Sequence, residues 1–596
     1  MNPQGGYTGK LLRVDLTTGK VDESDEHLRC ARDFIGGRGL GARLLWDLYT
    51  DAAPLAPASP LIFLTGPLTG LAPGAAHTAV VFKSPNTGIT LGHAVTGAQW
   101  GTELKSAGYD GLIVTGQAAK PVYLVVEDNA IASRDADFLW GKGTLETEVL
   151  LKNQLGDSRW RVLCIGPAGE NLVRFASIQQ EYFRSAARGG PGALMGSKRL
   201  KAIGVRGHGP IPLAQPQEYA TRYAEVLAKL RGAKSKRRGY YLSRWGSTMS
   251  HTSHSDVSEL DVRNYREGYW SEVDKISGFQ YERRSKVRAR SCFGCPIACM
   301  QTGVLREGAH AGTLTNPDFD SFGTIGPGCL VNDYAGAQYL SALGDDLGFD
   351  DASLGNVVGF AMECYERGLL TKADCDGLEL TWGNVAAMET LWHKIARREG
   401  IGDLLADGVR DAAAEIGRGA EHFAMHVKGL SFAGYAPQAH PDRALQYAVG
   451  DRGGCHHFGL DLTEQNARAW ADSLVSCSWH RALLASSDYL RLLSAATGWE
   501  YADDDWNNIA LRLLLMARAY NIREGMVPER DDVLPARVHD DVLTQGPRAG
   551  VVYARDDFQR DRAEWYAARG CDEKGYPTKQ TLDALGLGFA YAQNQV

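Results

Sequence analysis

The chain has 596 residues, a length typical of about three or four domains, with 44% hydrophobic and 23% charged residues. This composition excludes a disordered chain, and the net charge of −7 argues against a nucleic-acid-binding protein. No apolar run approaches the roughly 20 residues of a membrane span, and residues 1–6 show no secretory signal. Eleven cysteines in a chain of this length do not indicate a disulfide scaffold, so we expect a cytoplasmic protein.

The first ~205 residues predict a β-rich domain. Short β-type runs alternate with turn residues, and most are bounded by Gly, Pro, Asn or Asp. The runs cover residues 9–16, 60–64, 78–82, 111–115, 121–127, 161–165 and 201–205. Many short strands with regular turns favour a sheet-based domain with packed layers.

Helical periodicity dominates the rest of the chain. Residues 217–231 have helical spacing, whereas residues 233–290 are polar and are expected to be irregular and partly exposed. Apolar residues at spacings of three and four predict helices at 356–369, 384–399, 401–416, 467–484 and 506–523. We therefore predict an α+β, multidomain fold, with a β-rich domain (1–210) followed by two mainly helical domains (211–424 and 425–596).

Three cysteines, Cys292, Cys295 and Cys299, form a CxxCxxxC motif that we expect on a loop entering a helix. Thiolates at this spacing suit an iron–sulfur cluster or zinc. Only His310 follows nearby as a zinc ligand, so a cluster is favoured over zinc and over three chance core cysteines. The spacing alone leaves six candidates for a fourth thiolate: Cys329, Cys364, Cys375, Cys455, Cys477 and Cys571.

Three further motifs combine glycine with charged or titratable residues. Residues 184–193 pair arginines with small residues, which suits either an anion site or a structural turn. Asp345 and Asp350 flank Gly348 at a helix end, so they could accept hydrogen bonds from a polar heterocycle or merely cap the helix; a related spacing recurs at 472–477. In residues 451–457, a histidine could transfer protons or be structural.

Taken together, these motifs resemble the tungsten-containing aldehyde:ferredoxin oxidoreductase family over nearly the whole chain. The blocks that carry the resemblance follow one another in the family's order. They are residues 83–88, 103–111, 165–172 and 188–198, the CxxCxxxC motif, and residues 452–456.

The resemblance implies a tungsten (or molybdenum) held between two pyranopterins, with Mg²⁺ bridging the pterin phosphates. It implies a [4Fe–4S] cluster bound by Cys292, Cys295, Cys299 and Cys477. It makes His456 the active-site histidine and places Asp320 where the aldehyde enzymes carry a glutamate. The cofactor-binding residues that it implies are Gly97, Arg184, Ser185, Ala187, Arg188, Asp345, Gly348, Phe349, Asp350, Asp472 and Ser476.

The sequence departs from the family pattern at four points. Val475 and Ser476 stand where Gly-Leu is usual before the cluster cysteine, and His77 replaces an arginine. Asp320 is one methylene shorter than the family's glutamate. The ligands of a subunit-bridging iron are not evident.

The activity implied is oxidation of aldehydes to carboxylic acids, with electrons leaving through the cluster to a ferredoxin or a ferredoxin-like subunit. An oligomeric complex is expected, and the basic stretch 283–290 is a hypothetical docking site for an acidic carrier. Two alternatives remain. One is a dearomatising aryl-CoA reductase, which residues 575–588 also resemble, and the other is a pterin-free iron–sulfur electron-transfer subunit.

Overall fold

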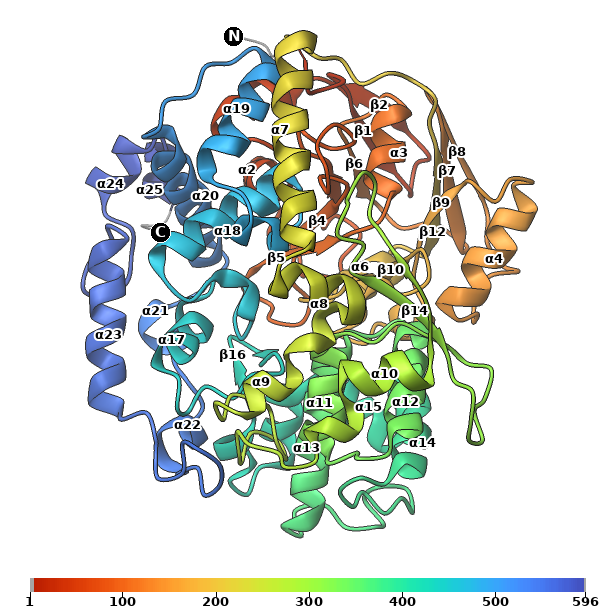
Figure 1. Ribbon diagram of the computed structural model, residues 1–596, viewed down its shortest axis with the longest axis vertical. Helices are drawn as coiled ribbons and strands as arrows, with labels where there is room; N and C mark the ends of the chain where they lie inside the picture. The colour runs from red at the N-terminus through yellow and green to blue at the C-terminus, as the bar shows by residue number, and fades with distance from the viewer. Residues whose placement is uncertain (1–4, 594–596) are drawn as a thin grey trace.

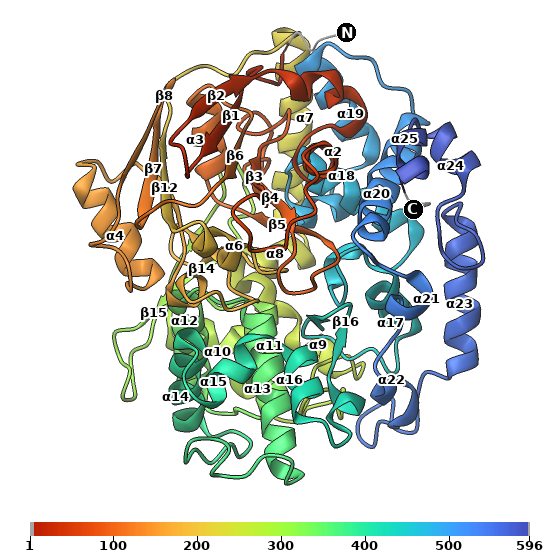
Figure 2. The same cartoon turned by 180° about the vertical axis from the view of Figure 1, so that it is seen from behind.

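The computed structural model describes residues 5–593, so residues 1–4, part of the segment tested for a secretory signal, lie outside it (Figures 1 and 2). Two six-stranded sheets form the N-terminal region. The first has the order β2-β1-β6-β3-β4-β5, and only β1 and β6 pair in parallel. Its strands are β1 (Leu11–Asp15), β2 (Val21–Ser24), β3 (Leu61–Leu64), β4 (Thr78–Lys83), β5 (Leu91–Thr96) and β6 (Gly111–Thr115).

The second sheet has the order β11-β10-β9-β12-β7-β8, with β7 and β12 in parallel. Its strands are β7 (Val122–Glu127), β8 (Ala130–Asp135), β9 (Arg161–Cys164), β10 (Ile178–Gln180), β11 (Arg184–Ala186) and β12 (Leu200–Arg206). One hydrophobic core contains Phe63 from the first sheet and Leu124 and Ile203 from the second. Each β-type run of the sequence thus corresponds to a strand, and the two sheets pack together through their apolar residues.

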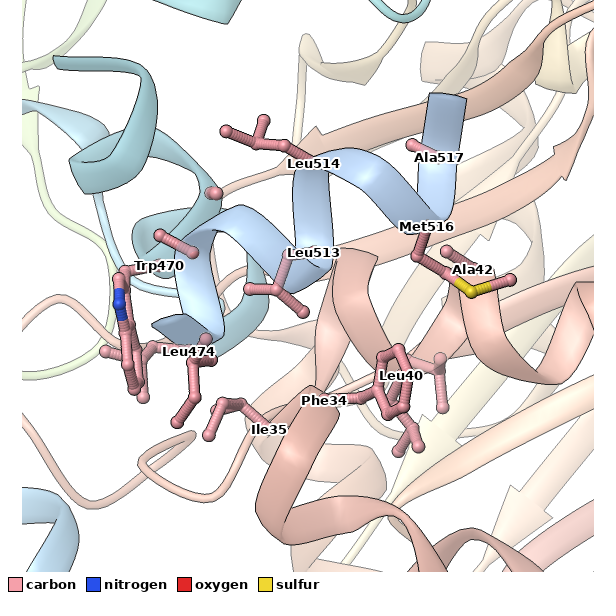
Figure 3. Close-up of a cluster of buried hydrophobic side chains, with 14 of the residues drawn as sticks. Phe34, Ile35, Leu40, Ala42, Trp470, Leu474, Leu513, Leu514, Met516 and Ala517 are labelled. Carbon is pink, nitrogen blue, oxygen red and sulfur yellow. The ribbon is translucent and has the colours of Figure 1, made fainter. Parts of the chain in front are cut away.

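Short helices connect these strands, and one of them joins the N-terminal region to the C-terminal helices. These helices are α1 (Ala31–Phe34), α2 (Gly37–Asp47), α3 (Trp100–Ser106), α4 (Thr144–Gln154), α5 (Pro167–Glu170) and α6 (Pro191–Ser197). Figure 3 shows Leu40 of α2 in the same apolar cluster as Leu474 and Leu513 of the C-terminal helices. A Cβ at Gly39 would lie 2.3 Å from Leu513 Cδ2, so glycine permits this close packing.

The middle of the chain is mainly helical, with one three-stranded sheet. Its strands are β13 (Lys286–Arg290), β14 (Met300–Val304) and β15 (Leu314–Thr315). Its helices are α7 (Pro216–Lys234), α8 (Arg237–Trp245), α9 (His251–Ser255), α10 (Gly278–Arg284), α11 (Phe319–Cys329), α12 (Tyr334–Leu347), α13 (Asp351–Glu366), α14 (Val385–Arg397), α15 (Ile401–Ala406) and α16 (Val409–Ile416).

The last part of the chain adds a small hairpin and nine helices among the described residues. The hairpin strands are β16 (His426–Val427) and β17 (Leu430–Ser431). The helices are α17 (Pro441–Val449), α18 (Leu462–Leu474), α19 (Ser486–Thr497), α20 (Asp505–Arg523), α21 (Pro528–Asp531), α22 (Ala536–Asp540), α23 (Arg555–Ala568), α24 (Lys579–Ala584) and α25 (Gly588–Gln593). None of the helices in residues 5–593 combines the length and apolar character of a membrane span.

The predicted α+β class is confirmed, whereas three local predictions are wrong. Residues 401–416 form two helices, because Gly408 between them has φ +89°. The helix predicted at 467–484 ends at Leu474, because Val475 adopts the left-handed conformation at φ 53°. Residues 233–290 contain three helices and a strand; α8 is supported by stacking of Tyr241 on Trp245 at 4.8 Å.

Candidate active site and cysteine loop

A cavity of about 580 Å³ lies where the N-terminal sheets meet both helical parts of the chain. It collects almost all the residues that the sequence singled out. The predicted residues that line it are Gly97, Arg184, Ser185, Ala187, Arg188, Cys292, Cys299, Asp320, Asp345, Phe349, Asp350, His456, Asp472, Ser476 and Cys477. Gly348 and Cys295 are not in its lining. A larger depression of about 740 Å³ between α20 and α24 contains none of them, so we place the candidate site in the smaller cavity.

The first acidic motif is shaped by a helix end. Gly348 caps α12 at φ +85°, and a Cβ there would lie 2.7 Å from the amide nitrogen of Gly166. The amide of Ser177 donates to Gly348 O (2.8 Å), and this contact fixes the turn against the second sheet. As a result, Asp345 and Asp350 face the cavity from either side of one tight turn.

The carboxylates of this turn are buried, and they are stabilised in different ways. Burial, reinforced by the nearby charge of Asp318, raises the pKa of Asp345 well above its usual value. Its Oδ1 accepts a hydrogen bond of 3.2 Å from Gln179. Asp350 instead pairs with Arg188 at 3.0 Å. Asp345 can therefore share protons with a bound polar group, whereas Asp350 is held by the protein.

Arg184 in β11 and Arg188 just after that strand have different surroundings. Arg188 donates to Ser353 Oγ (3.1 Å) and to Gly454 O (2.9 Å), and also to Ser431 O. Arg184 Nε is buried without a partner among the described residues. Arg188 is thus committed to protein contacts, while Arg184 is available to an anion in the cavity.

The second acidic motif follows α18. Asp472 lies in the last turn of that helix, and burial raises its pKa. Val475 caps the helix at φ 53°, a left-handed conformation that costs a branched residue roughly 1–2 kcal/mol relative to glycine. This geometry gives a physical reason why glycine is usual at this position in the family that the sequence resembles.

Asp320 and His456 face one another in the cavity. Their Oδ2 and Nε2 atoms are 3.5 Å apart, and Gly434 N donates to Asp320 Oδ1 at 3.2 Å. Burial, together with the charge of Asp318, raises the pKa of Asp320 to about 7. Burial also lowers the pKa of His456 well below its usual value, with neighbouring His457 adding to the effect. Near neutral pH, His456 is therefore uncharged, and its Nδ1 has no partner among residues 5–593.

The CxxCxxxC motif joins β13 to β14, so the expectation that it enters a helix is wrong. Arg290 pairs with Met300 across the hairpin, and Ala298 has φ +56°, which a right-handed helix does not allow. Burial raises the pKa of the Cys477 thiol, and the three thiols of this loop raise it further. The amide of Cys477 donates to Gly74 O (3.2 Å), beside the loop. The fold therefore brings the distant Cys477 to the motif.

Other residues at the site were not identified from the sequence. His480 Nε2 lies 3.5 Å from Cys295 Sγ, and its place three residues after Cys477 could have signalled it. Tyr435 stacks on Phe319 (4.6 Å) and contacts His456 (5.1 Å), but no local pattern marks it. Cys455 lies apart from the cysteine loop; its sulfur contacts Arg452 at 2.9 Å. Within residues 5–593, no group of three or more His, Cys, Asp or Glu is arranged to hold a single metal ion.

Comparisons with known proteins identify the family. Residues 11–207 match the model of the aldehyde ferredoxin oxidoreductase N-terminal domain, and residues 224–587 match that of its domains 2 and 3. The chain is 35% identical to the tungsten-containing aldehyde ferredoxin oxidoreductase of Pyrococcus furiosus, over 98% of this chain and all of that protein. The relative from Pyrococcus horikoshii is also 35% identical, over 98% of this chain and 99% of that protein.

Two other relatives widen the comparison. A protein of Pyrococcus furiosus described as the WOR-like subunit of an aliphatic sulfonate oxidoreductase is 34% identical, over 98% of this chain and 97% of that protein. A chain in the structure of the active site complex BamBC of benzoyl coenzyme A reductase with 1,5-dienoyl-CoA superposes with a TM-score of 0.87 at 27% identity. That match covers all of this chain and 98% of the other.

The fold and the cavity thus define a large oxidoreductase of the tungstopterin class. The chain belongs to the aldehyde ferredoxin oxidoreductase family.

The Gly348 turn can be tested by adding one methyl group. Gly348→Ala should lower the thermal midpoint clearly, because it adds both left-handed strain of roughly 1–2 kcal/mol and a clash with Gly166. Gly368→Ala is the matched control: it also has positive φ (+69°), but open space around its Cβ. Thermal unfolding should show a larger shift for Gly348→Ala, and equal shifts would contradict the packing argument.

Proposed function

We propose that this protein oxidises aldehydes to carboxylic acids at a tungsten (or molybdenum) bis-pyranopterin and passes the electrons through a [4Fe–4S] cluster to a ferredoxin-like carrier. The observation that carries the proposal is the convergence on one cavity of the Asp320–His456 pair, both acidic motifs and Cys292, Cys299 and Cys477. The aldehyde activity of 35%-identical relatives supports the choice of substrate class.

The four thiols fit a cluster in their chemistry. Cys292 is buried, and Cys295, Cys299 and Cys477 are partly buried. A four-iron cluster takes one thiolate per iron, so its ligands surround a volume rather than a single ion. Arg184, which lines the same cavity, supplies positive charge beside Cys292. We therefore assign Cys292, Cys295, Cys299 and Cys477 as cluster ligands.

The cavity also fits two pterins. Asp345, Asp350 and Asp472 would hold N–H groups of the heterocycles, since carboxylates accept such hydrogen bonds. Among residues 5–593, Arg184 Nε has no partner and suits a pterin phosphate. Gln179, which donates to Asp345 of the cavity lining, also has a buried Oε1 with no partner among these residues. The remaining residues that we assign to the pterin side are Gly97, Ser185, Ala187, Arg188, Gly348, Phe349 and Ser476.

We assign a bridging Mg²⁺ to the phosphate side near Arg184 and Ser185, on the family resemblance. The proposed domain limits follow the same division. Residues 1–210 would carry the phosphate side, residues 211–424 the CxxCxxxC motif and first acidic motif, and residues 425–596 His456 and the second acidic motif.

Aldehyde oxidation needs a group that removes protons next to a two-electron acceptor. The bound tungstopterin would supply the electron acceptor. Neutral His456 would accept a proton at Nδ1 from a hydroxyl of the hydrated aldehyde or, in its other tautomer, donate Nδ1–H to the free carbonyl oxygen. Asp320, with its pKa near 7, would hold Nε2 of His456 and share the proton that this ring nitrogen carries. Tyr435 packs against His456 and limits the orientation of its ring.

A dearomatising aryl-CoA reductase is the second candidate, because the benzoyl coenzyme A reductase chain superposes with a TM-score of 0.87. The chain is 35% identical to the aldehyde enzyme but 27% identical to the benzoyl coenzyme A reductase chain, which favours aldehyde oxidation. Viologen-linked turnover with an aldehyde panel, and its absence with aryl-CoA thioesters, would separate the two. A pterin-free electron-transfer subunit would turn over neither.

Cysteine replacement tests the cluster. Cys292→Ser, Cys295→Ser, Cys299→Ser and Cys477→Ser should each lose or cripple the [4Fe–4S] signal, because thiolates hold such clusters. Cys455→Ser is the matched control and should keep it, since Cys455 contacts Arg452 instead. Iron content and low-temperature EPR of the reduced protein measure this. A full cluster in the Cys477 variant with loss in the Cys455 variant would contradict the assignment.

The Asp320–His456 pair predicts a specific pH dependence. His456→Ala should lower kcat by roughly 10²–10⁴-fold with the cofactor retained, as for other acid–base groups. Because Asp320 loses its proton near pH 7 and His456 is neutral throughout, kcat/KM should rise with pH through about 7. Asp320→Asn should abolish this rise and should lower kcat less than His456→Ala does. Asp320→Glu should keep the rise. An unchanged profile in Asp320→Asn would remove Asp320 from the reaction.

A further inference from the structure

Residues 226–255 carry an unusual charge pattern. They contain seven Lys or Arg residues and no Asp or Glu, in a chain whose net charge is −7. They form the end of α7, all of α8 and α9, and the turns between them. A local charge opposite to that of the whole molecule marks a surface for an acidic partner.

The basic side chains of this segment are largely unpaired. Arg231, Lys234, Lys236 and Arg238 are exposed, and in residues 5–593 no carboxylate lies within ion-pair distance of any of them. By contrast, Lys229 pairs with Asp488 at 2.5 Å. Four exposed cations on neighbouring turns are therefore free to meet an external negative surface.

The same segment lies directly on the cysteine loop. Gln301 Nε2, just after the motif, donates to Ser243 O in α8 (3.3 Å). A Cβ at Gly246 would lie 3.0 Å from Cys299 O, and the Arg238 guanidinium is 5.4 Å from the ring of Trp479, two residues after Cys477. Figure 1 shows α8 below α7, with the hairpin strand β14 to its side.

Exposed aromatic residues complete this surface. Phe293, inside the CxxCxxxC motif, is 45% exposed, and Tyr240 of α8 is 46% exposed. Protein interfaces combine such aromatic residues with a charged rim. Lys234 of α7 also lies within electrostatic range of Cys295 in the cysteine loop.

The stretch 283–290, which the sequence suggested as a docking site, is largely used inside the molecule. Arg284 pairs with Glu307, and Lys286 donates to Arg244 O. Arg290 donates to the backbone carbonyls of residues 181 and 182. Only Arg283 and Arg288 of its arginines are exposed.

We infer that Arg231, Lys234, Lys236, Arg238 and Phe293, the α7–α8 basic face, dock an acidic iron–sulfur electron carrier beside the cluster ligands. This inference rests on the proposed function, which requires electrons to leave through the cluster. Opposite charges would steer the carrier to the face, so association should weaken with added salt.

Charge reversal tests the inference on the reconstituted holoenzyme. The probe is a purified acidic bacterial ferredoxin. Benzyl viologen is the comparison acceptor, because a small dye does not need a protein docking face. The double variant Lys234→Glu/Lys236→Glu should weaken ferredoxin binding about tenfold or more at low salt, because attraction becomes repulsion. The KM for ferredoxin should rise by a similar factor. Turnover with benzyl viologen should change less than about twofold, since the cavity is untouched. Lys234→Gln with Lys236→Gln should give a smaller loss in the same direction.

Arg283→Glu with Arg288→Glu is the matched control, and should leave ferredoxin binding unchanged. The inference is overturned if calorimetric ferredoxin affinity is unaffected in the Lys234/Lys236 variants, or if the control pair causes the loss instead. It is also overturned if nucleic acid or a second copy of the chain occupies the α7–α8 basic face and ferredoxin still binds. A wild-type enzyme inactive with aldehydes and viologen would refute the proposed function, and the binding isotherms would still decide the docking face.

Discussion

One arginine joins the three parts of the chain around the cavity. Arg188 follows strand β11 of the second N-terminal sheet and pairs with Asp350 of the middle part at 3.0 Å. It also donates to the backbone carbonyls of Ser431 and Gly454 in the last part. Removing one partner of such a buried pair typically costs about 3–5 kcal/mol, because the other charge is left unpaired. Gly454 lies two residues before His456, so the same side chain fixes the acidic turn relative to the proposed catalytic histidine.

The electrostatics of the cavity follow from this enclosure. Burial raises the pKa of Asp320 to about 7 and lowers that of His456, so the pair stays poised for proton transfer near neutrality. The unpartnered Arg184 Nε and Gln179 Oε1 would be costly in a site that held nothing polar. The proposed two-pterin occupancy explains why such groups are kept in a closed interior. The Asp320–His456 pair and the cysteine thiols then line one cavity, with Cys295 near Lys234 of the α7–α8 basic face.

Local pattern predicted much of this molecule. Strands bounded by turn residues and most helices with apolar spacing were placed correctly, because alternation and periodicity are local properties. The helix predicted at 467–484 ends at Leu474 instead. The Gly348 cap was also readable, since glycine at a helix end is a local signal. The break at Gly408 was missed, and the cysteine loop was wrongly expected to enter a helix, because the β13–β14 pairing decides its path. The meeting of Cys477 with a loop 178 residues earlier came only from the family resemblance, and the nearness of Lys234 to Cys295 required the tertiary structure.

Metal and pterin analysis of the purified chain tests the central claim most directly. Loaded protein should contain about one tungsten or molybdenum, two pterins and about four irons per chain, because one cavity serves the pterins and the cluster. Iron without tungsten, molybdenum or pterin would contradict the account, and would mark the chain as an electron-transfer subunit whose acidic cavity serves another purpose.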